Sequence, residues 1–258
     1  MKVLVCGKGG SGKSVITAML ARELARRGFK ILVVDMDESN ATLHRQLGLR
    51  SPRDLIEYFG GRKKFSQEIF SKLKGKSDEE IQAEIFGGKW RLANLPEGYV
   101  EEKNGIKLLS IGKIHDYGEG CACPMGGLAR AFLGNLELGE GEIVLVDSDA
   151  GVEHFGRGVE ASCDLILAVI DPTFESVRLS KLILEMAGKL GKPAYLVLNK
   201  VDREAARLLL EQVDKEKVLA VIPQSREIFL ACLKGEEVDV QLGEVEKLAD
   251  RLLSLLSR

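Results

Sequence analysis

Residues 7–14, Gly-Lys-Gly-Gly-Ser-Gly-Lys-Ser, have the types and spacing needed to hold phosphate groups. They fit the phosphate-loop pattern G-x-x-x-x-G-K-[ST], which places Lys13 on the β- and γ-phosphates and Ser14 on Mg²⁺. The glycines let the backbone approach an anion, and the loop amides and the next helix N-terminus then hold it. We therefore expect a nucleotide to bind the loop residues Gly9, Gly10, Ser11, Gly12, Lys13, Ser14 and Val15.

The second group of reactive side chains is the pair Cys121 and Cys123, in Gly-Glu-Gly-Cys-Ala-Cys-Pro at 118–124. Two thiolates at this spacing can point the same way from an extended backbone, but they make only half of a tetrahedral soft-metal site. A two-fold dimer would complete four thiolates, which suit one Zn²⁺ or Ni²⁺ per dimer or an iron–sulfur cluster. The alternatives are an inert buried pair or a redox disulfide, because C-x-C alone is a weak motif.

Acidic residues follow two apolar, strand-like runs. The run 31–35 ends in Asp35, Asp37 lies two residues further on, and Asp147 follows Ile143-Val144-Leu145-Val146. Hydrophobic residues followed by an aspartate are the Walker B arrangement, which places Asp147 near Mg²⁺. An acid at the end of 31–35 would lie beside the γ-phosphate. Either acid alone could instead cap a helix, but two beside a phosphate loop favour a metal–nucleotide site.

The elements that must position these residues alternate along the chain. Strand-like runs recur at 2–6, 31–35, 143–147, 164–170, 194–198 and 217–222, and helical patterns at 13–27, 174–190, 203–212 and 225–234. This alternation predicts an α/β fold, a single phosphate-loop NTPase domain over 1–258 with a mostly parallel, doubly wound sheet flanked by helices. Ligands bind at the carboxyl ends of such strands, where the phosphate loop and the acids lie.

Residues 41–140 interrupt the alternation. We expect a helical insertion at about 60–89, a hairpin at Asn104-Gly105 and the cysteine segment. The lysine-rich insertion is interpreted as a solvated helix, with a docking surface for an acidic partner as the alternative. The apolar stripe that starts at Val245 predicts a helix packed on the sheet, because its polar face mixes acidic and basic residues and a membrane-surface helix would be more basic.

Composition excludes several classes of function. The net charge of −2 and the 5% of aromatic residues argue against nucleic-acid binding. No apolar run is long enough to cross a membrane, so we expect no membrane partner. The first strand begins at Lys2, which leaves no room for a signal peptide, and five cysteines is an odd number. We therefore expect a reducing cytoplasm and no disulfide framework.

Lys8 is a second lysine, at the start of the loop. Lys8-Gly9-Gly10 followed by Gly12-Lys13-Ser14 resembles the deviant phosphate loop of the nitrogenase iron protein and of the septum-site (MinD) and plasmid-partition (ParA) ATPases. In that family the early lysine crosses a dimer interface to the partner's nucleotide. The resemblance implies an ATP-sandwiched homodimer with Lys8 as a catalytic residue. The alternative is an ordinary phosphate loop with a solvated lysine.

The same resemblance assigns two further residues. Asp37 is the switch I aspartate that orients the attacking water beside Mg²⁺, although Asp35 could hold the Mg²⁺ shell instead. In Asp149-Ala150-Gly151, the amide of Gly151 matches the glycine of switch II that senses the γ-phosphate.

The residues expected to contact the base support two interpretations. Asn199-Lys200-Val201-Asp202 matches the guanine-reading motif of many GTPases. In the deviant phosphate-loop ATPases, an asparagine here contacts adenine, and a segment like that at Pro223 lies against the base. We favour ATP over GTP, with Asn199, Lys200 and Pro223 at the base and Asp202 capping the next helix.

Gly-Glu-Gly-Cys-Ala-Cys-Pro at 118–124 and Asp-Ala-Gly-Val-Glu-His-Phe-Gly-Arg-Gly at 149–158 resemble the CooC-type ATPases, which help to insert nickel into carbon monoxide dehydrogenase. This resemblance implies a dimeric ATPase that carries a soft metal on Cys121 and Cys123 to carbon monoxide dehydrogenase or a related nickel enzyme. The alternatives are a MinD/ParA-like positioning ATPase and an iron–sulfur cluster carrier or reductase.

Overall fold

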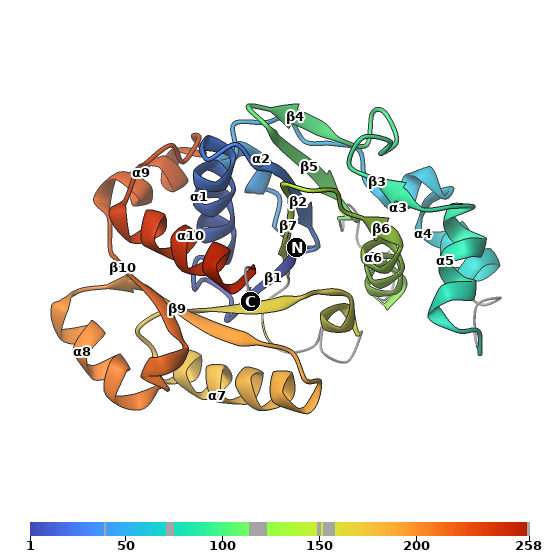
Figure 1. Cartoon of the computed structure of the whole chain (residues 1–258). Coiled ribbons are helices and arrows are strands. Elements are labelled where there is room, and N and C mark those ends of the chain that lie inside the picture. Colours follow the sequence, from blue (N-terminus) through green and yellow to red (C-terminus); the bar gives the residue numbers. More distant parts are fainter. Residues whose placement is uncertain (39, 71–74, 114–122, 149–150, 152–157, 257–258) are drawn as a thin grey trace.

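The computed structural model describes residues 1–38, 40–70, 75–113, 123–148, 151 and 158–256. It confirms the α/β fold with a mostly parallel central sheet (Figure 1). The order of the main sheet is β10-β9-β8-β1-β7-β2-β5-β4, and β3 pairs with β6 apart from it. The strands are β1 (Lys2–Gly7), β2 (Lys30–Asp35), β3 (Trp90–Arg91), β4 (Glu101–Lys103), β5 (Ile106–Ser110), β6 (Leu136–Glu137), β7 (Glu142–Asp147), β8 (Leu165–Ile170), β9 (Ala194–Val201) and β10 (Val218–Pro223).

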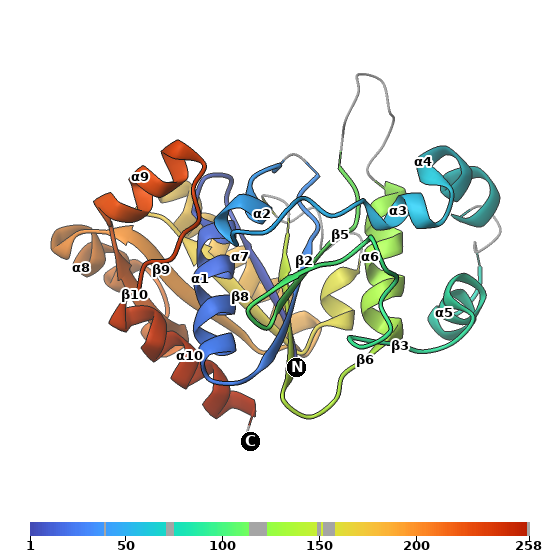
Figure 2. The same cartoon turned by 90° about the horizontal axis from the view of Figure 1, so that it is seen from above.

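Helices cover both faces of this sheet, as the view from above shows (Figure 2). Because successive side chains of a strand point to opposite faces, Val3 and Val5 pack with α1 and α10, whereas Leu4 and Cys6 pack with α6 and α7. The α-helices are α1 (Lys13–Arg26), α2 (Leu43–Gln46), α3 (Leu55–Tyr58), α4 (Gly61–Lys64), α5 (Asp78–Phe86), α6 (Cys123–Asn135), α7 (Phe174–Lys189), α8 (Arg203–Gln212), α9 (Arg226–Lys234) and α10 (Gly243–Leu256).

Strand β5 pairs with two strands, and the hairpin pattern predicted only one of these pairings. The hairpin forms, with β4 antiparallel to β5. On its other side, β5 runs parallel to β2, from Ile31 opposite Ile106 to Asp35 opposite Ser110. This pairing brings the residues that follow β5 to the same sheet edge as Asp35 and the phosphate loop.

The insertion at about 60–89 contains α4, a π-helical segment at Phe65–Phe70 and α5. Although α5 is largely exposed, aromatic rings attach this region to the core. Phe86 and Trp90 contact Phe132 of α6 at ring-centroid distances of 6.4 and 6.1 Å. The end of the insertion therefore packs against α6, although α5 itself is largely exposed to solvent.

The C-terminal helix α10 packs on α1 and β10, with Val245, Leu248 and Leu252 buried. This is the packed helix that the apolar stripe predicted. Among the helices of the described residues, none is both long and apolar enough to cross a membrane.

Candidate functional site

The phosphate loop joins β1 to α1 through two glycines that no other residue could replace without strain. Gly7 has φ 142°, and a Cβ there would lie 2.4 Å from the carbonyl oxygen of Val169. Gly12 has φ 97° at the N-cap of α1, so the first-turn amides of the helix face the loop. The amide of Gly151 donates a hydrogen bond to the Gly7 carbonyl at 3.1 Å, which joins the expected switch II glycine to the start of the loop.

A cavity of about 670 Å³ opens beside this loop. It contains most of the residues that the sequence assigned to a nucleotide: Gly9, Gly10, Gly12, Lys13, Ser14, Val15, Asn199, Lys200 and Pro223. Ser11 is completely buried behind the loop, and Lys13 is buried with its ammonium 3.5 Å from the carbonyl oxygen of Lys8. A pocket of this size, lined by loop amides and a lysine, suits a nucleoside triphosphate.

Oxygen ligands gather around Ser14 at the phosphate end of the cavity. The Ser14 hydroxyl donates to Asp147 Oδ2 at 2.6 Å and accepts from Asn40 Nδ2 at 2.7 Å. Asp147 is fully buried, and burial raises its pKa to about 6, while the hydrogen bond from Ser14 and the charge of Lys13 oppose this shift. Hydroxyl and carboxylate oxygens are the ligands that Mg²⁺ prefers, so this group fits a Mg²⁺ ion.

The structure separates the two acids after β2. Asp37 lines the cavity, and its Oδ1 accepts the Asn40 amide at 3.1 Å. Asp35 is buried, and its Oδ2 makes an ion pair with Lys113 Nζ at 2.6 Å. Burial raises the pKa of Asp35 to about 7, against the opposing charge of Lys113. Of the two acids, Asp37 is the one placed to meet a nucleotide.

Lys8 points away from the cavity in this single chain. Its ammonium lies 3.1 Å from Asp171 Oδ2 and 3.1 Å from Thr173 Oγ1, just beyond the carboxyl end of β8. Burial would raise the pKa of Asp171, but hydrogen bonds from Ser176, Thr173 and Lys8 outweigh it and lower the pKa. Asp171 follows an apolar strand, as Asp35 and Asp147 do, so the same sequence signal could have identified it.

The expected base end lies between β9, β10 and α9. Asn199 Nδ2 donates to the Ser11 carbonyl at 2.9 Å, and Lys200 Nζ donates to the Gly10 carbonyl at 2.8 Å. Ser225, Ile228, Phe229 and Cys232 of the α9 region also line the cavity. Sequence reasoning predicted helix α9 but did not assign it to the site, because its periodicity indicates a helix and not what the helix faces.

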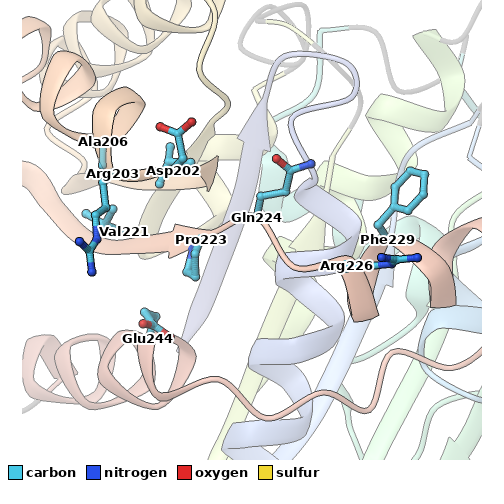
Figure 3. A pocket seen from close by; sticks show the side chains of 10 residues that line it. Asp202, Arg203, Ala206, Val221, Pro223, Gln224, Arg226, Phe229 and Glu244 are labelled. Atoms are coloured by element: carbon cyan, nitrogen blue, oxygen red, sulfur yellow. The ribbon is translucent and has the colours of Figure 1, made fainter.

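A second cavity, of about 680 Å³, adjoins the first and shares Pro223, Gln224 and Phe229 with it. Its walls come from the ends of β9 and β10 and from α8, α9 and α10 (Figure 3). Asp202 lines this second cavity, and its Oδ1 accepts the Ala205 amide at 2.8 Å, so it caps α8. Asp202, the last residue of the guanine-reading pattern, therefore caps a helix and lines the second cavity, not the cavity beside the phosphate loop.

The metal-binding prediction falls largely outside the part of the chain that the structure describes. Cys121 lies in the undescribed segment 114–122, and of Cys123 only its position at the start of α6 is described. In the described residues, no three or more His, Cys, Asp or Glu side chains gather as a metal site. Cys6 and Cys163 are buried, and burial raises the pKa of each thiol to about 12, so both are unreactive core residues.

Comparison with known proteins identifies the family of this chain. A family model described as the CobQ/CobB/MinD/ParA nucleotide binding domain matches residues 2–238. The chain belongs to this CobQ/CobB/MinD/ParA family. The family is one of nucleotide-binding domains, in agreement with the cavity beside the phosphate loop.

Two known proteins are similar to this chain along most of its length. An uncharacterized ATP-binding protein of Methanocaldococcus jannaschii is 53% identical over 252 residues, which cover 98% of this chain and 99% of that protein. The carbon monoxide dehydrogenase accessory protein CooC of Rhodospirillum rubrum is 33% identical over 231 residues, which cover 86% and 83%.

Among solved structures, the septum site-determining protein MinD of Pyrococcus horikoshii, complexed with Mg-ADP, matches with a TM-score of 0.67. The match covers 99% of this chain and 96% of that one at 19% identity, which supports the fold alone. The assignment to the CobQ/CobB/MinD/ParA family therefore rests on the family model, which matches residues 2–238.

Proposed function

We propose that this protein is an ATPase that closes as a homodimer around its nucleotides and binds one soft metal ion, Zn²⁺ or Ni²⁺, between the Cys121 and Cys123 pairs. Its client would be carbon monoxide dehydrogenase or a related nickel enzyme. The observation that carries the nucleotide part is the cavity that brings Lys13, Ser14, Asp37 and Asn199 together. The metal part rests on the cysteine motif and on the 33% identity to CooC.

ATP is favoured over GTP by the surroundings of the base end. Asp202, which would have to read guanine, caps α8 and lines the neighbouring cavity. The side-chain amide nitrogen of Asn199 donates a hydrogen bond to the Ser11 carbonyl oxygen. Isothermal titration should give an affinity for ATP at least about tenfold higher than for GTP, because each specific polar contact is worth roughly 1–2 kcal/mol. Equal affinities would remove this part of the proposal.

Hydrolysis needs mainly positioning and charge from the protein. Lys13 and the loop amides would hold the β- and γ-phosphates, and Asp37 would orient a water in line with the γ-phosphoryl group. Bound Mg²⁺ would supply positive charge that stabilises the transferred phosphoryl group. Ser14, Asp37 and Asp147 would hold it, since Ser14 is hydrogen-bonded to Asp147 and lines the cavity together with Asp37. Loss of the γ-phosphate would then release Asp37 and the amide of Gly151.

The homodimer is supported by the edge of the molecule around Lys8. Lys8 is 28% exposed and donates to the hydroxyl of Thr173, and the next residue in the chain is Phe174, whose large apolar side chain is 78% exposed. An exposed aromatic ring on the same segment as the partners of Lys8 suits a surface that a second copy covers. ATP binding would favour the closed dimer and bring the two cysteine pairs together.

Native mass spectrometry under anaerobic conditions, with Zn²⁺ or Ni²⁺ and with or without ATP, tests this proposal. We expect one metal ion per two chains in the presence of ATP. Cys123→Ser should abolish stoichiometric metal binding and leave ATP binding intact, whereas Cys163→Ala, which changes a buried thiol, should keep the metal. An ATP-dependent dimer that never holds metal would favour a positioning ATPase instead. A coloured, oxygen-sensitive protein would favour an iron–sulfur carrier.

A further inference from the structure

The side chain of Lys113, three residues beyond the end of β5, reaches the residues that follow β2. Its ammonium lies 2.6 Å from Asp35 Oδ2, 2.5 Å from the Asp37 carbonyl oxygen and 2.6 Å from the Asn40 carbonyl oxygen. An ammonium has three protons to donate, and these three oxygens can accept all of them. The lysine side chain is only 14% exposed, so losing these acceptors would be costly.

The main chain of Asp37 is held on both sides by this arrangement. Its amide donates to Asp35 Oδ1 at 3.2 Å, and its carbonyl accepts from the Lys113 ammonium. Asp35 is a firm point of attachment, because it ends β2 between Ser110 of β5 and Asp147 of β7 in the sheet register. The peptide groups of Asp37 are thus fixed to the sheet, while its side chain lines the nucleotide cavity.

Asn40 is held by the same ammonium and contacts the phosphate loop. Its carbonyl accepts from Lys113, and its Oδ1 accepts the amide of Thr42 at 3.0 Å. Its Nδ2 donates to the Ser14 hydroxyl at 2.7 Å. One ammonium therefore holds the main chain of Asp37 and of Asn40, which both line the cavity.

Lys113 is itself anchored outside the cavity. Its amide donates to Asp54 Oδ2 at 2.9 Å, and its carbonyl accepts from Arg62 Nη2 at 3.3 Å. Asp54 is buried and accepts from the Ser110 hydroxyl at 2.5 Å. Lys113 is not among the described residues that line the cavity, so it can act on a nucleotide only through the residues that it holds.

We propose that Lys113 is a positioning residue of the nucleotide site, which holds Asp37 and Asn40 in place before Mg²⁺ and nucleotide bind. The inference rests on the proposed function for the identity of that ligand. Without the ammonium, the main chain of these two residues would become ordered only on binding, and the affinity for Mg²⁺ and nucleotide together would carry that cost. The affinity for nucleotide alone depends mainly on the phosphate loop and should not change.

Titration calorimetry with ATPγS, in Mg²⁺ and in EDTA, measures this difference. A Lys8→Ala background keeps the proposed dimer from contributing. For Lys113→Met, the affinity in EDTA should stay within about twofold, whereas the increase in affinity on adding Mg²⁺ should shrink by about tenfold, the cost of ordering one or two residues. Lys107→Met is the matched control, because Lys107 on β5 also donates to a main-chain carbonyl, that of Leu92, outside the cavity.

Hydrogen exchange in the nucleotide-free protein gives a second readout that needs no ligand. The amides of Asp37, Asn40 and Thr42 each donate a hydrogen bond in this arrangement. They should exchange at least about fivefold faster in Lys113→Met than in Lys107→Met, because the main chain of Asp37 and Asn40 opens more often without the ammonium.

Two further variants separate positioning from folding. If Lys113→Met does not fold, because it leaves the Asp35 carboxylate buried without a cation, Lys113→Met is combined with Asp35→Asn, which removes both charges. Asp35→Asn alone keeps the ammonium on the two carbonyls and should retain the Mg²⁺ response to within about threefold.

A folded Lys113 variant with the full Mg²⁺ response, or with unchanged exchange at the three amides, would overturn the inference. So would an equal loss of affinity in EDTA and in Mg²⁺, or a loss in Asp35→Asn as large as that in Lys113→Met. A Lys8→Ala protein whose affinity for ATPγS does not rise with Mg²⁺ would contradict it too. The proposed function fails on other observations, when the unaltered protein does not hydrolyse ATP or holds no metal in native mass spectrometry, and neither result changes the outcome for Lys113.

Discussion

Two carboxylates two residues apart have opposite surroundings in this protein. Asp35 is buried against Lys113, whereas Asp37 lines the cavity beside Ser14. Asp37→Asn should lower kcat for ATP hydrolysis by about 10²-fold or more, the usual effect of losing a residue that positions or deprotonates a water. KM for ATP should change by only a few-fold, because the phosphate contacts of Lys13 and the loop remain.

Steady-state kinetics checks this prediction, with Asp202→Asn as the control. Asparagine caps a helix as well as aspartate does, so that variant should keep its kcat and its preference for ATP. An Asp37→Asn protein with unchanged kcat would assign the hydrolytic water to another group.

Glu160, in the short 3₁₀ helix Val159–Ser162, should make the free energy of unfolding of the protein depend on pH. Burial raises its pKa to about 7 from an ordinary value of 4.5. Between these two values the folded state binds more protons than the unfolded state, so the free energy of unfolding falls as the pH rises. Glu160→Gln removes this loss and should be more stable than the natural chain at pH 8, by roughly 1–3 kcal/mol.

Urea unfolding of both proteins between pH 5 and 8 measures the difference. The two free energies of unfolding should converge toward pH 5, where Glu160 is protonated in the folded state. A difference that does not change with pH would mean that the carboxyl is already ionised in the fold.

Among the secondary-structure elements, β9 supports the phosphate loop. Asn199 Nδ2 donates to the Ser11 carbonyl at 2.9 Å, and a Cβ on Gly12 would lie 2.4 Å from that nitrogen. Asn199→Ala leaves a buried loop carbonyl without this donor, which costs about 1–2 kcal/mol. We expect the affinity for ATP to fall by about tenfold with little change in the far-UV circular dichroism.

Titration calorimetry with ATP and with GTP measures this effect. If the loop attachment is responsible, both nucleotides should lose affinity. A loss for ATP alone would show that Asn199 contacts the base and not only the loop.

Elements differ in how far the sequence predicted them. The strands and helices of the alternating parts were placed within a few residues, because a buried parallel strand and an amphipathic helix have local patterns. The hairpin was also predicted from Asn104-Gly105. Its second strand β5 joins the main sheet beside β2, which depends on a partner distant in sequence and has no local signal.

At the scale of the whole molecule, the ion pair of Lys8 opposes the proposed dimerisation, because it must break before the dimer forms. Lys8 must leave Asp171, 3.1 Å away, before it can reach a partner's nucleotide. The pair is partly exposed and so contributes about 1 kcal/mol or less. Asp171→Asn should therefore strengthen ATP-dependent dimerisation by up to about fivefold, whereas Lys8→Ala should abolish it.

Light scattering after size exclusion, with ATP and Mg²⁺, distinguishes these outcomes over a range of protein concentrations. Lys189→Gln is a suitable control, because Lys189 pairs with Glu185 at the opposite end of α7 from Phe174. Weaker dimerisation of Asp171→Asn would mean that Asp171 supports the interface and does not retain Lys8.

The sequence alone determined the phosphate loop, the α/β fold and the acids after the strands, because each depends on residues that are close together in the chain. The cysteine pair and its metal remain a prediction from the sequence. Only the tertiary structure decided that Lys8 makes an ion pair with Asp171, that Asp35 makes one with Lys113 and that α9 lines the cavity. These contacts join residues far apart in sequence, and the strand order brings them to one edge of the sheet.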